Sequence, residues 1–343
     1  MKNIFKVTFV IVGTMIGAGF ASGQEIYMFF YKYGIKGMLG ILISCILTGI
    51  IIAKTFNIVR KHNNNSYEEF LSTINKKKNI NKVTNIVIQT FLLISFYIMV
   101  AGFSAYFNQE FDIPVFAGSI IMAILCYITF QKDISGIVSV NSFLIPALIL
   151  FIAYLGIKNG GFTYQNLIVQ KNIEVLSSSS IFDNWLVSSI LYASYNSIML
   201  IPMIIELSKY MDSNKKIYTT SIISTIILSI LGICLFCLLL RGQGYISQLE
   251  LPIVYIVKEF GNVYQWFYGI VIITAIFTSA ISIGYSFLKN CTKTKKAYKY
   301  LNIFICLSAI LVSNIGFSNL VSTLYPAFGV LGLFQICMLL FKT

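Results

Sequence analysis

Residues 4–31 form an apolar stretch that is long enough to cross a bilayer, yet its centre does not favour a continuous helix. Four glycines lie within eleven residues, at Gly13, Gly17, Gly19 and Gly23. Glycine costs up to about 1 kcal/mol relative to alanine in a helix, and each backbone group that a break exposes to hydrocarbon costs several more. A break is tolerated where the freed carbonyls and amides line a cavity. An interrupted span is therefore the sequence feature that best indicates a transporter binding site.

The composition is that of a helical membrane protein with several spans. Hydrophobic residues make up 57% and charged residues 11% of the 343 residues, whereas a soluble domain carries roughly 25% charged residues. The net charge of +13 would suit a nucleic-acid partner, but the lysines cluster in short segments between apolar runs, where the positive-inside rule places them. We therefore expect a lipid bilayer around the chain and no nucleic-acid partner.

Residue types that support catalysis are scarce. The single histidine, His62, lies in a predicted loop, and Cys234 and Cys237 form a CxxC pair inside a predicted helix. The segment GAGFASG does not fit the GxGxxG nucleotide fingerprint, and the sequence contains no Walker A, HExxH or Ser/His/Asp set. We expect no enzyme activity and no cofactor. The first apolar stretch is too long for a signal peptide and is predicted to stay as the first span.

The chain divides into two halves of five predicted spans each. The ten predicted spans are 4–31, 36–58, 83–108, 114–131, 134–157, 184–209, 217–240, 262–288, 297–314 and 316–341. Each start in the second half follows its counterpart by 179 to 183 residues, and long loops at 59–82 and 241–261 follow the second span of each half. Because an odd number of spans inverts the second copy, we expect an all-α integral membrane protein with ten transmembrane helices in a 5+5 inverted repeat. The repeats are 1–157 and 184–343, joined by an extracellular loop at 158–183.

The distribution of Lys and Arg predicts the orientation in the membrane. With the N-terminus inside, cytoplasmic segments hold 18 of these residues and outer segments hold six, while Lys54 extends its ammonium toward the inner face. This bias places both termini in the cytoplasm. The Ile-, Lys- and Asn-rich composition is typical of an AT-rich bacterial source, so we expect the bacterial cytoplasmic membrane.

These features resemble a known transporter architecture. Five plus five inverted spans, a glycine-broken first span and a long loop after spans two and seven are similar to the LeuT fold of the amino acid–polyamine–cation (APC) superfamily. The segment GTMIGAGFASGQEI, followed by the aromatic MFFY, resembles in particular the YkvI-like family of bacterial membrane proteins. With helices 1 and 6 both broken mid-membrane, we expect the breaks near Ile16–Gly19 and Ser194–Ser197, facing each other.

The resemblance also implies a sodium site between spans one and eight. Ala275, Thr278 and Ser279 match the A-x-x-T-S pattern of sodium-coupled members of this fold, and they lie at i, i+3 and i+4 on one helical face. Alignment of the glycines adds the carbonyls of Gly13 and Ile16. Five neutral oxygens suit a hard monovalent ion. The alternative is that the hydroxyls bond to carbonyls of their own helix or serve helix packing.

A substrate pocket is expected between the two predicted breaks. Span six carries the polar run SYNS within residues 191–202, and four polar side chains in a row do not share one helical face. Tyr97 in span three is expected to face both breaks, because related transporters often place a tyrosine hydroxyl there. The expected substrate-binding residues are Gly17, Ala18, Gly19, Tyr97, Ser194, Tyr195 and Asn196. The alternative is hydrogen bonding between helices, with a kink at Pro202.

Two carboxylates lie within predicted spans. Glu25 and Glu206 are 181 residues apart, which is the repeat offset. An intramembrane acid is by default a functional hypothesis. Glu25 lies ~21 residues, or ~31 Å of helix, from the start of its span, and so is expected toward the outer face, with Glu206 toward the inner face. We expect gate or vestibule residues that attract cationic ligands. The alternative is that both are hydrated at helix ends.

The function that these features indicate is secondary active transport, by sodium-coupled symport of a small organic solute such as an amino acid or an amine. A proton is the alternative coupling ion. The alternative function is a non-transporting ligand sensor on the same scaffold, as in the membrane subunits of spore germinant receptors. A sensor needs a pocket but no working ion site, so Thr278 and Ser279 favour transport. The pairs Gly13/Gly17 and Gly19/Gly23 also fit close helix packing.

Overall fold

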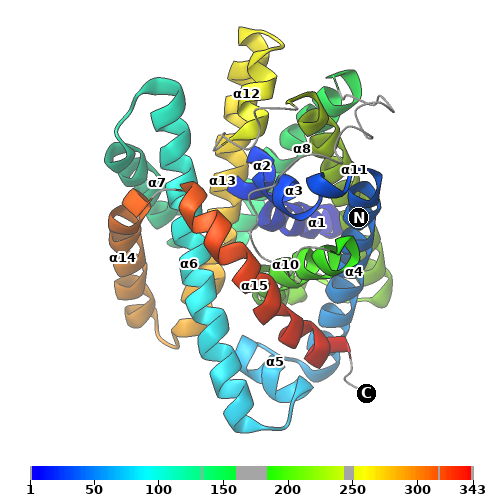
Figure 1. Cartoon of the computed structure of the whole chain (residues 1–343). Coiled ribbons are helices and arrows are strands. Elements are labelled where there is room, and N and C mark those ends of the chain that lie inside the picture. Colours follow the sequence, from blue (N-terminus) through cyan, green and yellow to red (C-terminus); the bar gives the residue numbers. More distant parts are fainter. Residues whose placement is uncertain (1, 133, 160–183, 243–250, 316, 341–343) are drawn as a thin grey trace.

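The structure is a computed structural model that describes residues 2–132, 134–159, 184–242, 251–315 and 317–340 (Figure 1). The described chain is helical and contains no strand. The helices of the first half are α1 (Lys2–Met15), α2 (Ala18–Ser22), α3 (Gln24–Phe29), α4 (Ile35–His62), α5 (Tyr67–Ile74), α6 (Lys78–Phe111), α7 (Val115–Phe130) and α8 (Ile134–Asn159). Those of the second half are α10 (Trp185–Leu207), α11 (Asn214–Leu239), α12 (Pro252–Lys258), α13 (Asn262–Cys291), α14 (Lys295–Val312) and α15 (Phe317–Leu340).

Among the described residues, seven helices are long and apolar enough to cross a membrane. These are the helices that begin at Ile35, Lys78, Ile134, Trp185, Asn214, Asn262 and Lys295. Val115–Phe130 and Ala327–Leu340 are apolar but shorter, so the count of ten spans stays a prediction. The division into two repeats stays a prediction as well, and residues 160–183 of the expected outer loop lie outside the described chain.

The first span is not one helix. α1 ends at Met15 and α2 begins at Ala18, and between them Gly17 is extended, with φ −89° and ψ −165°. A second change of direction follows at Gly23, whose φ of +85° lies in the left-handed region that glycine adopts without strain. The chain therefore leaves helical geometry within the segment where the glycines predict a break.

The predicted break in span six is wrong, because α10 runs without interruption through Ser194–Ser197. Its polar side chains bond to the backbone of their own helix. The Ser194 hydroxyl donates to the Ile190 carbonyl at 2.7 Å, and the Asn196 amide donates to the Tyr192 carbonyl at 2.9 Å. Such bonds satisfy a polar group without opening the helix. The polar residues of α10 are therefore accommodated without a break in the helix.

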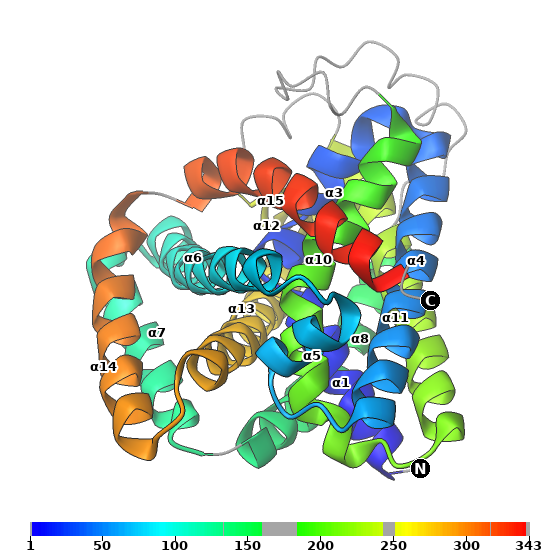
Figure 2. The same ribbon diagram turned by 90° about the horizontal axis from the view of Figure 1, so that it is seen from below.

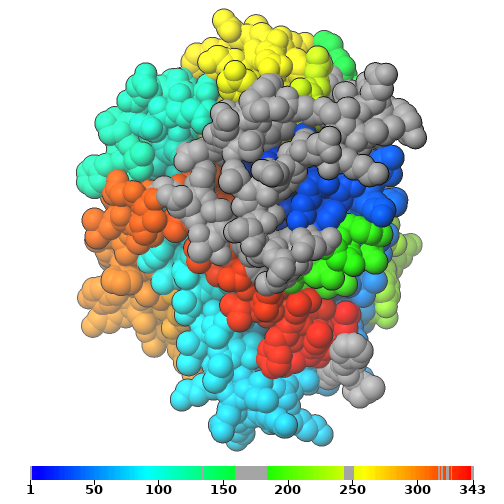
Figure 3. Space-filling view, in the orientation of Figure 1, coloured from blue at the N-terminus to red at the C-terminus, as the bar shows by residue number. Residues whose placement is uncertain are grey.

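The helices surround a centre formed by the first span and α10. α1 contacts α8, α10, α11 and α13, while α10 packs against α4 and α15. α6 packs against α13 and α7, and α14 packs against α7 at one side of the bundle (Figures 1 and 2). α15 lies across the outside of the face shown in Figure 3. Helices α5 and α12 lie in the two long loops that follow the second span of each half.

The outer surface of the bundle is apolar, as a lipid-facing surface requires. Large hydrophobic side chains are widely exposed on the outer helices, and Phe143 and Ile157 on α8 are both 81% exposed. Leu311 on α14 is 72% exposed. Exposure of this extent is costly in water but favourable in a bilayer. The surface thus agrees with the composition in identifying a membrane protein.

One close contact holds α15 against α10 and provides a test of the packing. A methyl group on Gly332 would lie 2.1 Å from the carbonyl oxygen of Ser194, which is backbone and has little freedom to move. We expect Gly332→Ala to destabilise the protein by about 1–3 kcal/mol, because the two helices must separate. Thermal unfolding of the purified protein in detergent measures this loss.

The matched control is Gly329→Ala, one turn earlier on α15. A methyl group there would lie 3.2 Å from the Leu191 side chain and carbonyl, which is tight but tolerable. We expect a clearly smaller drop in melting temperature for this variant. Equal drops for the two variants would contradict the close approach at Gly332.

Candidate functional site

The break in the first span leaves backbone amides that a continuous helix would have paired, and the structure supplies other partners. The Gly17 amide donates to the Met15 carbonyl at 3.0 Å. The Ala18 amide donates to the sulfur of Met99 on α6 at 3.4 Å. Gly17 packs closely on the same side chain, since a Cβ there would lie 3.0 Å from that sulfur. Met99 of span three thus contacts the break.

The carbonyls freed by the break turn toward α13. The hydroxyl of Ser279 donates to the Gly13 carbonyl at 2.7 Å and lies 3.3 Å from the Thr14 carbonyl. Among the described residues, no hydrogen bond to the Ile16 carbonyl is present. All these groups are buried. A hydroxyl of span eight therefore meets two freed carbonyl oxygens of span one, and the ion site expected between these spans stays a prediction.

The other two predicted ion ligands on α13 are Ala275, one turn before Ser279, and Thr278, the residue next to it. The Thr278 hydroxyl bonds to carbonyls of its own helix, at 2.9 Å from Thr274 and 3.1 Å from Ala275. These are the intrahelical bonds that the alternative interpretation predicts. Ala275 and Thr278 are fully buried. In this conformation only Ser279 of the three reaches across to the first span.

Asn141 on α8 was not predicted from the sequence but also faces this point. A Cβ on Gly13 would lie 2.0 Å from the Asn141 amide oxygen, so Gly13 packs directly on that side chain. The Asn141 nitrogen donates to the Ile137 carbonyl at 3.0 Å, whereas its buried oxygen has no hydrogen-bond partner among the described residues. An unpartnered buried oxygen costs free energy, so it requires an explanation. The structure thus holds an unpartnered oxygen of α8 against Gly13 of the first span.

A second polar group lies between the first span and α10. The Glu25 carboxylate accepts hydrogen bonds from the Tyr192 hydroxyl at 3.0 Å and the Tyr195 hydroxyl at 3.4 Å. Glu25 is only 1% exposed, and no ion pair to it is present in the described part of the chain. A buried carboxylate is normally paired with a cation. Here its described partners are neutral hydroxyls.

Aromatic rings enclose this carboxylate. The Tyr192 ring lies 5.2 Å from Phe29 and 5.1 Å from Phe30, both by edge-on contacts. The Tyr195 ring lies 4.6 Å from the ring of Tyr325 on α15. These residues are all buried. The surroundings therefore combine one acid, tyrosine hydroxyls and ring faces, a set of groups that binds organic cations.

The prediction that Glu25 lines an open vestibule is wrong for this conformation, because the carboxylate is buried. The prediction measured depth along a straight helix. The turns at Gly17 and Gly23 instead fold the chain back, so that a Cβ on Gly19 would lie 2.5 Å from the Glu25 carboxylate. Glu206 is partly exposed near the end of α10, and its expected place at the inner mouth stays a prediction.

The prediction that Tyr97 faces the break is also wrong. Its hydroxyl hydrogen bonds with that of Ser308 on α14, at 2.6 Å. Residues two apart on a helix point about 200° apart. Because Met99 faces the break, Tyr97 must point to the other side of α6.

The remaining predicted residues of span six divide between two faces of α10. Ser194 packs against Gly332 on α15, away from the first span. Tyr195 reaches Glu25. The Asn196 amide oxygen is buried and has no hydrogen-bond partner among the described residues. The structure thus brings Tyr195 to the candidate site, together with Gly19.

Comparisons with known proteins place the chain among bacterial membrane proteins. No protein-family model matches it. The chain is 29% identical over 346 residues to YkvI, an uncharacterized membrane protein of Bacillus subtilis (strain 168), and the match covers 98% of this chain and 95% of YkvI. It is 25% identical over 347 residues to YyaD, an uncharacterized protein of the same organism, with 98% and 96% covered.

Solved structures of similar fold are transporters. One is the substrate-bound outward-open state of a Na⁺-coupled sialic acid symporter, with a TM-score of 0.67 and 15% identity, covering 99% of this chain and 78% of that one. Another is MhsT in complex with L-phenylalanine, with a TM-score of 0.59 and 17% identity, covering 98% and 88%. The resemblance that the glycine-rich first span indicates is confirmed: over almost its whole length the chain is similar to YkvI and YyaD, and it has the LeuT fold.

Proposed function

We propose that this chain is a secondary active transporter that moves a small organic solute, an amino acid or an amine, together with a cation. The observation that carries the proposal is the contact of the Ser279 hydroxyl with the freed carbonyls of Gly13 and Thr14. An interrupted span whose backbone oxygens meet a hydroxyl of another helix is the arrangement that holds a coupling ion in transporters of this kind. The Na⁺ coupling of the sialic acid symporter, which has a similar fold, supports sodium as that ion.

The oxygens at this point suit sodium. They are neutral carbonyl and hydroxyl groups, which a hard monovalent cation prefers. In this conformation the Ser279 proton points to the Gly13 carbonyl. Rotation of the hydroxyl would turn a lone pair toward the same point, where the Gly13 and Ile16 carbonyls and the Asn141 amide oxygen would join it. A small shift of α13 would bring Thr278, with Ala275, into the same set.

The solute is proposed to bind beside Glu25. A carboxylate held by the Tyr192 and Tyr195 hydroxyls and surrounded by rings attracts an ammonium group through charge and cation–π contact. Both tyrosines lie on α10, whereas Glu25 lies on the first span. Separation of these elements would open the carboxylate to solvent. The buried arrangement therefore corresponds to a closed state of the site.

The contacts of the first span support movement at its break. α1 contacts α8, α10, α11 and α13, whereas α2 contacts α6, α12 and α13, and α3 contacts α10 and α11. The two sides of the break thus share α10, α11 and α13, but α8 packs on α1 whereas α6 and α12 pack on α2. Extended backbone at Gly17 lets one side tilt while the other stays in place. Alternating access requires a hinge of this kind at the binding site.

A specific observation supports a proton as the second candidate for the coupling ion. Glu25 is buried between two helices with no cationic partner in the described chain. An acid that is alternately buried and exposed can take up and release a proton, as carboxylates do in other transporters. A proton also needs no cavity, and Gly19 packs directly on Glu25.

Sodium is expected to raise the melting temperature of the purified protein, and Ser279→Ala is expected to abolish this effect. An ion that binds only the folded protein stabilises it by about 1.4 kcal/mol at ten times its Kd. The matched control is Ser282→Ala, because the Ser282 hydroxyl is equally buried on α13 but bonds to the Thr278 carbonyl of its own helix. The measurement is a thermal-shift titration with sodium, potassium and choline chlorides.

Two outcomes would contradict the sodium site. Equal stabilisation by the three salts would show an effect of ionic strength. Loss of the sodium effect in Ser282→Ala as well as Ser279→Ala would show general damage to α13. Either result would leave the proton as the coupling ion to test, by uptake driven by a pH gradient in proteoliposomes.

Glu25→Gln is expected to weaken binding of a cationic or zwitterionic solute at least tenfold while leaving the sodium effect in place. The variant removes the charge but keeps two polar atoms for the tyrosine hydroxyls, and a close charge pair is worth roughly 1 to 4 kcal/mol. A thermal-shift screen of amino acids and amines identifies the solute, and uptake into proteoliposomes measures the change. Tyr195→Phe is expected to have a smaller effect, because its 3.4 Å bond is the longer one.

Unchanged uptake by Glu25→Gln would assign Glu25 to a structural role. Binding of a solute without accumulation inside proteoliposomes, under either ion gradient, would favour the sensor function instead. The two results are distinguishable because the first tests the residue and the second tests transport.

A further inference from the structure

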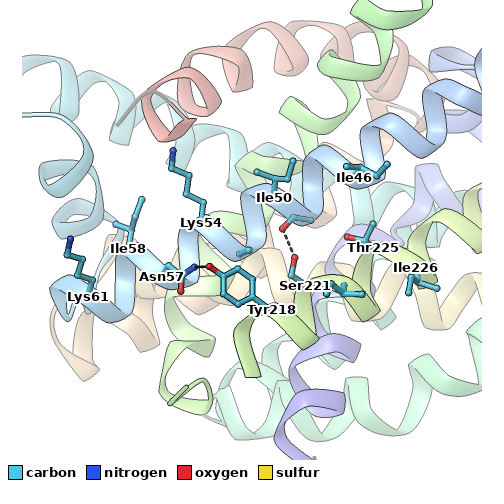
Figure 4. A pocket seen from close by; sticks show the side chains of 13 residues that line it. Ile46, Ile50, Lys54, Asn57, Ile58, Lys61, Tyr218, Ser221, Thr225 and Ile226 are labelled. Atoms are coloured by element: carbon cyan, nitrogen blue, oxygen red, sulfur yellow. Dashed lines mark hydrogen bonds between the residues drawn. The ribbon is translucent and has the colours of Figure 1, made fainter. Parts of the chain in front are cut away.

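A groove on the outside of the bundle lies between α4 and α11, on a side of each helix that the candidate site does not use. It has a volume of about 680 Å³ (Figure 4). α4 and α11 are the second helices of the two predicted repeats. The groove is therefore distinct from the break in the first span and from Glu25.

The floor of the groove is a close helix crossing. The Ser221 hydroxyl of α11 donates to the Gly49 carbonyl of α4. A Cβ on Gly49 would lie 2.1 Å from the Thr225 hydroxyl, so only glycine permits this approach. Isoleucine side chains rise beside the crossing and stay about half exposed: Ile46 55%, Ile50 49%, Ile222 59% and Ile226 52%. This part of the groove is shaped for a hydrocarbon chain.

The other end of the groove is polar and positively charged. Lys54 and Lys61 line it from α4, and Figure 4 shows both pointing to the same side. The Lys54 ammonium is held by a 2.6 Å bond to the Leu340 carbonyl, which leaves two of its protons for another acceptor. The Asn57 amide donates to the Tyr218 hydroxyl at 3.3 Å across the groove. The Lys/Arg bias predicts that this end lies at the cytoplasmic face.

The length of the groove matches one leaflet of a bilayer. Ile46 and Lys61 are 15 residues apart on one helix, or about 22 Å. Ile46 and Lys54 are eight residues apart, or about 12 Å. The hydrocarbon half of a bilayer is about 15 Å thick, so a chain beside Ile46 and Ile50 would place its headgroup between the two lysines.

We propose that this groove binds an anionic phospholipid of the cytoplasmic leaflet, with its phosphate between Lys54 and Lys61 and an acyl chain along the isoleucines. Basic pockets between helices at the cytoplasmic side suit lipids of this charge. A zwitterionic lipid would fill the apolar part equally well but would lack net charge for the lysines. The proposal does not depend on the transported solute or on the coupling ion.

Native mass spectrometry of the detergent-purified full chain tests the proposal. The probes are phosphatidylglycerol and phosphatidylcholine with identical acyl chains, and soluble glycerol 3-phosphate. We expect phosphatidylglycerol to bind preferentially, and each of Lys54→Gln and Lys61→Gln to weaken it on the order of fivefold. The matched control is Lys295→Gln, which like each of these variants removes one positive charge, from an exposed position on α14.

A second variant separates the groove from its charge. Ile50→Trp keeps both lysines and fills the apolar part at a half-exposed position, where folding tolerates a larger side chain. We expect it to lose phosphatidylglycerol binding as well. Four outcomes would each overturn the proposal. The first two are equal binding of the two lipids and an equal loss of phosphatidylglycerol binding in the α14 variant. The others are glycerol 3-phosphate binding as well as the lipid, and occupation of the groove by a second copy of the chain that lipid does not displace.

Discussion

Backbone groups inside a membrane must find partners within the protein, and this constraint governs the centre of the molecule. Where the first span stops being helical, the Ala18 amide finds the Met99 sulfur and the Gly13 carbonyl finds the Ser279 hydroxyl. These contacts tie the break to α6 and α13. The same contacts place oxygen atoms from two helices at one buried point. The contacts that repair the interrupted helix are thus the same contacts that form the proposed ion site.

Buried charged side chains must find partners within the protein as well, and for Glu25 the described partners are neutral. The turns at Gly17 and Gly23 return its carboxylate to the interior, where α10 supplies two tyrosine hydroxyls. Hydroxyls satisfy the lone pairs of a carboxylate but do not neutralise its charge. The charge is left for something that the described chain does not contain. A cationic solute or a proton would meet that requirement, which is why Glu25 is central to the proposed transport.

Much of this arrangement could be predicted because its physical signals are local in the sequence. The spacing of the glycines predicted the break in the first span. The i, i+3, i+4 spacing on α13 identified Ser279, whose hydroxyl bonds to the Gly13 carbonyl. The failures concern direction within a helix. Tyr97 and Met99 lie two residues apart and point to opposite sides, so a prediction of the wrong face selected the wrong residue. Asn141 could not be predicted, because it is a single amide in an apolar helix and belongs to no sequence pattern. Its contact with Gly13 depends on how α8 packs on α1.

The continuity of α10 is what brings two tyrosines to Glu25. Tyr192 and Tyr195 lie at i and i+3, so an unbroken helix points both at Glu25, whereas the predicted break at Ser194–Ser197 would have taken Tyr195 out of that register. Tyr192 was not predicted for the same reason, because in a broken helix Tyr192 and Tyr195 would not be expected to share a face. In this conformation the first half supplies an interrupted span and the second half supplies a continuous helix that carries the tyrosines. For the proposed transport this asymmetry favours movement at the break rather than within α10, because among the described residues of the site the extended backbone lies at Gly17.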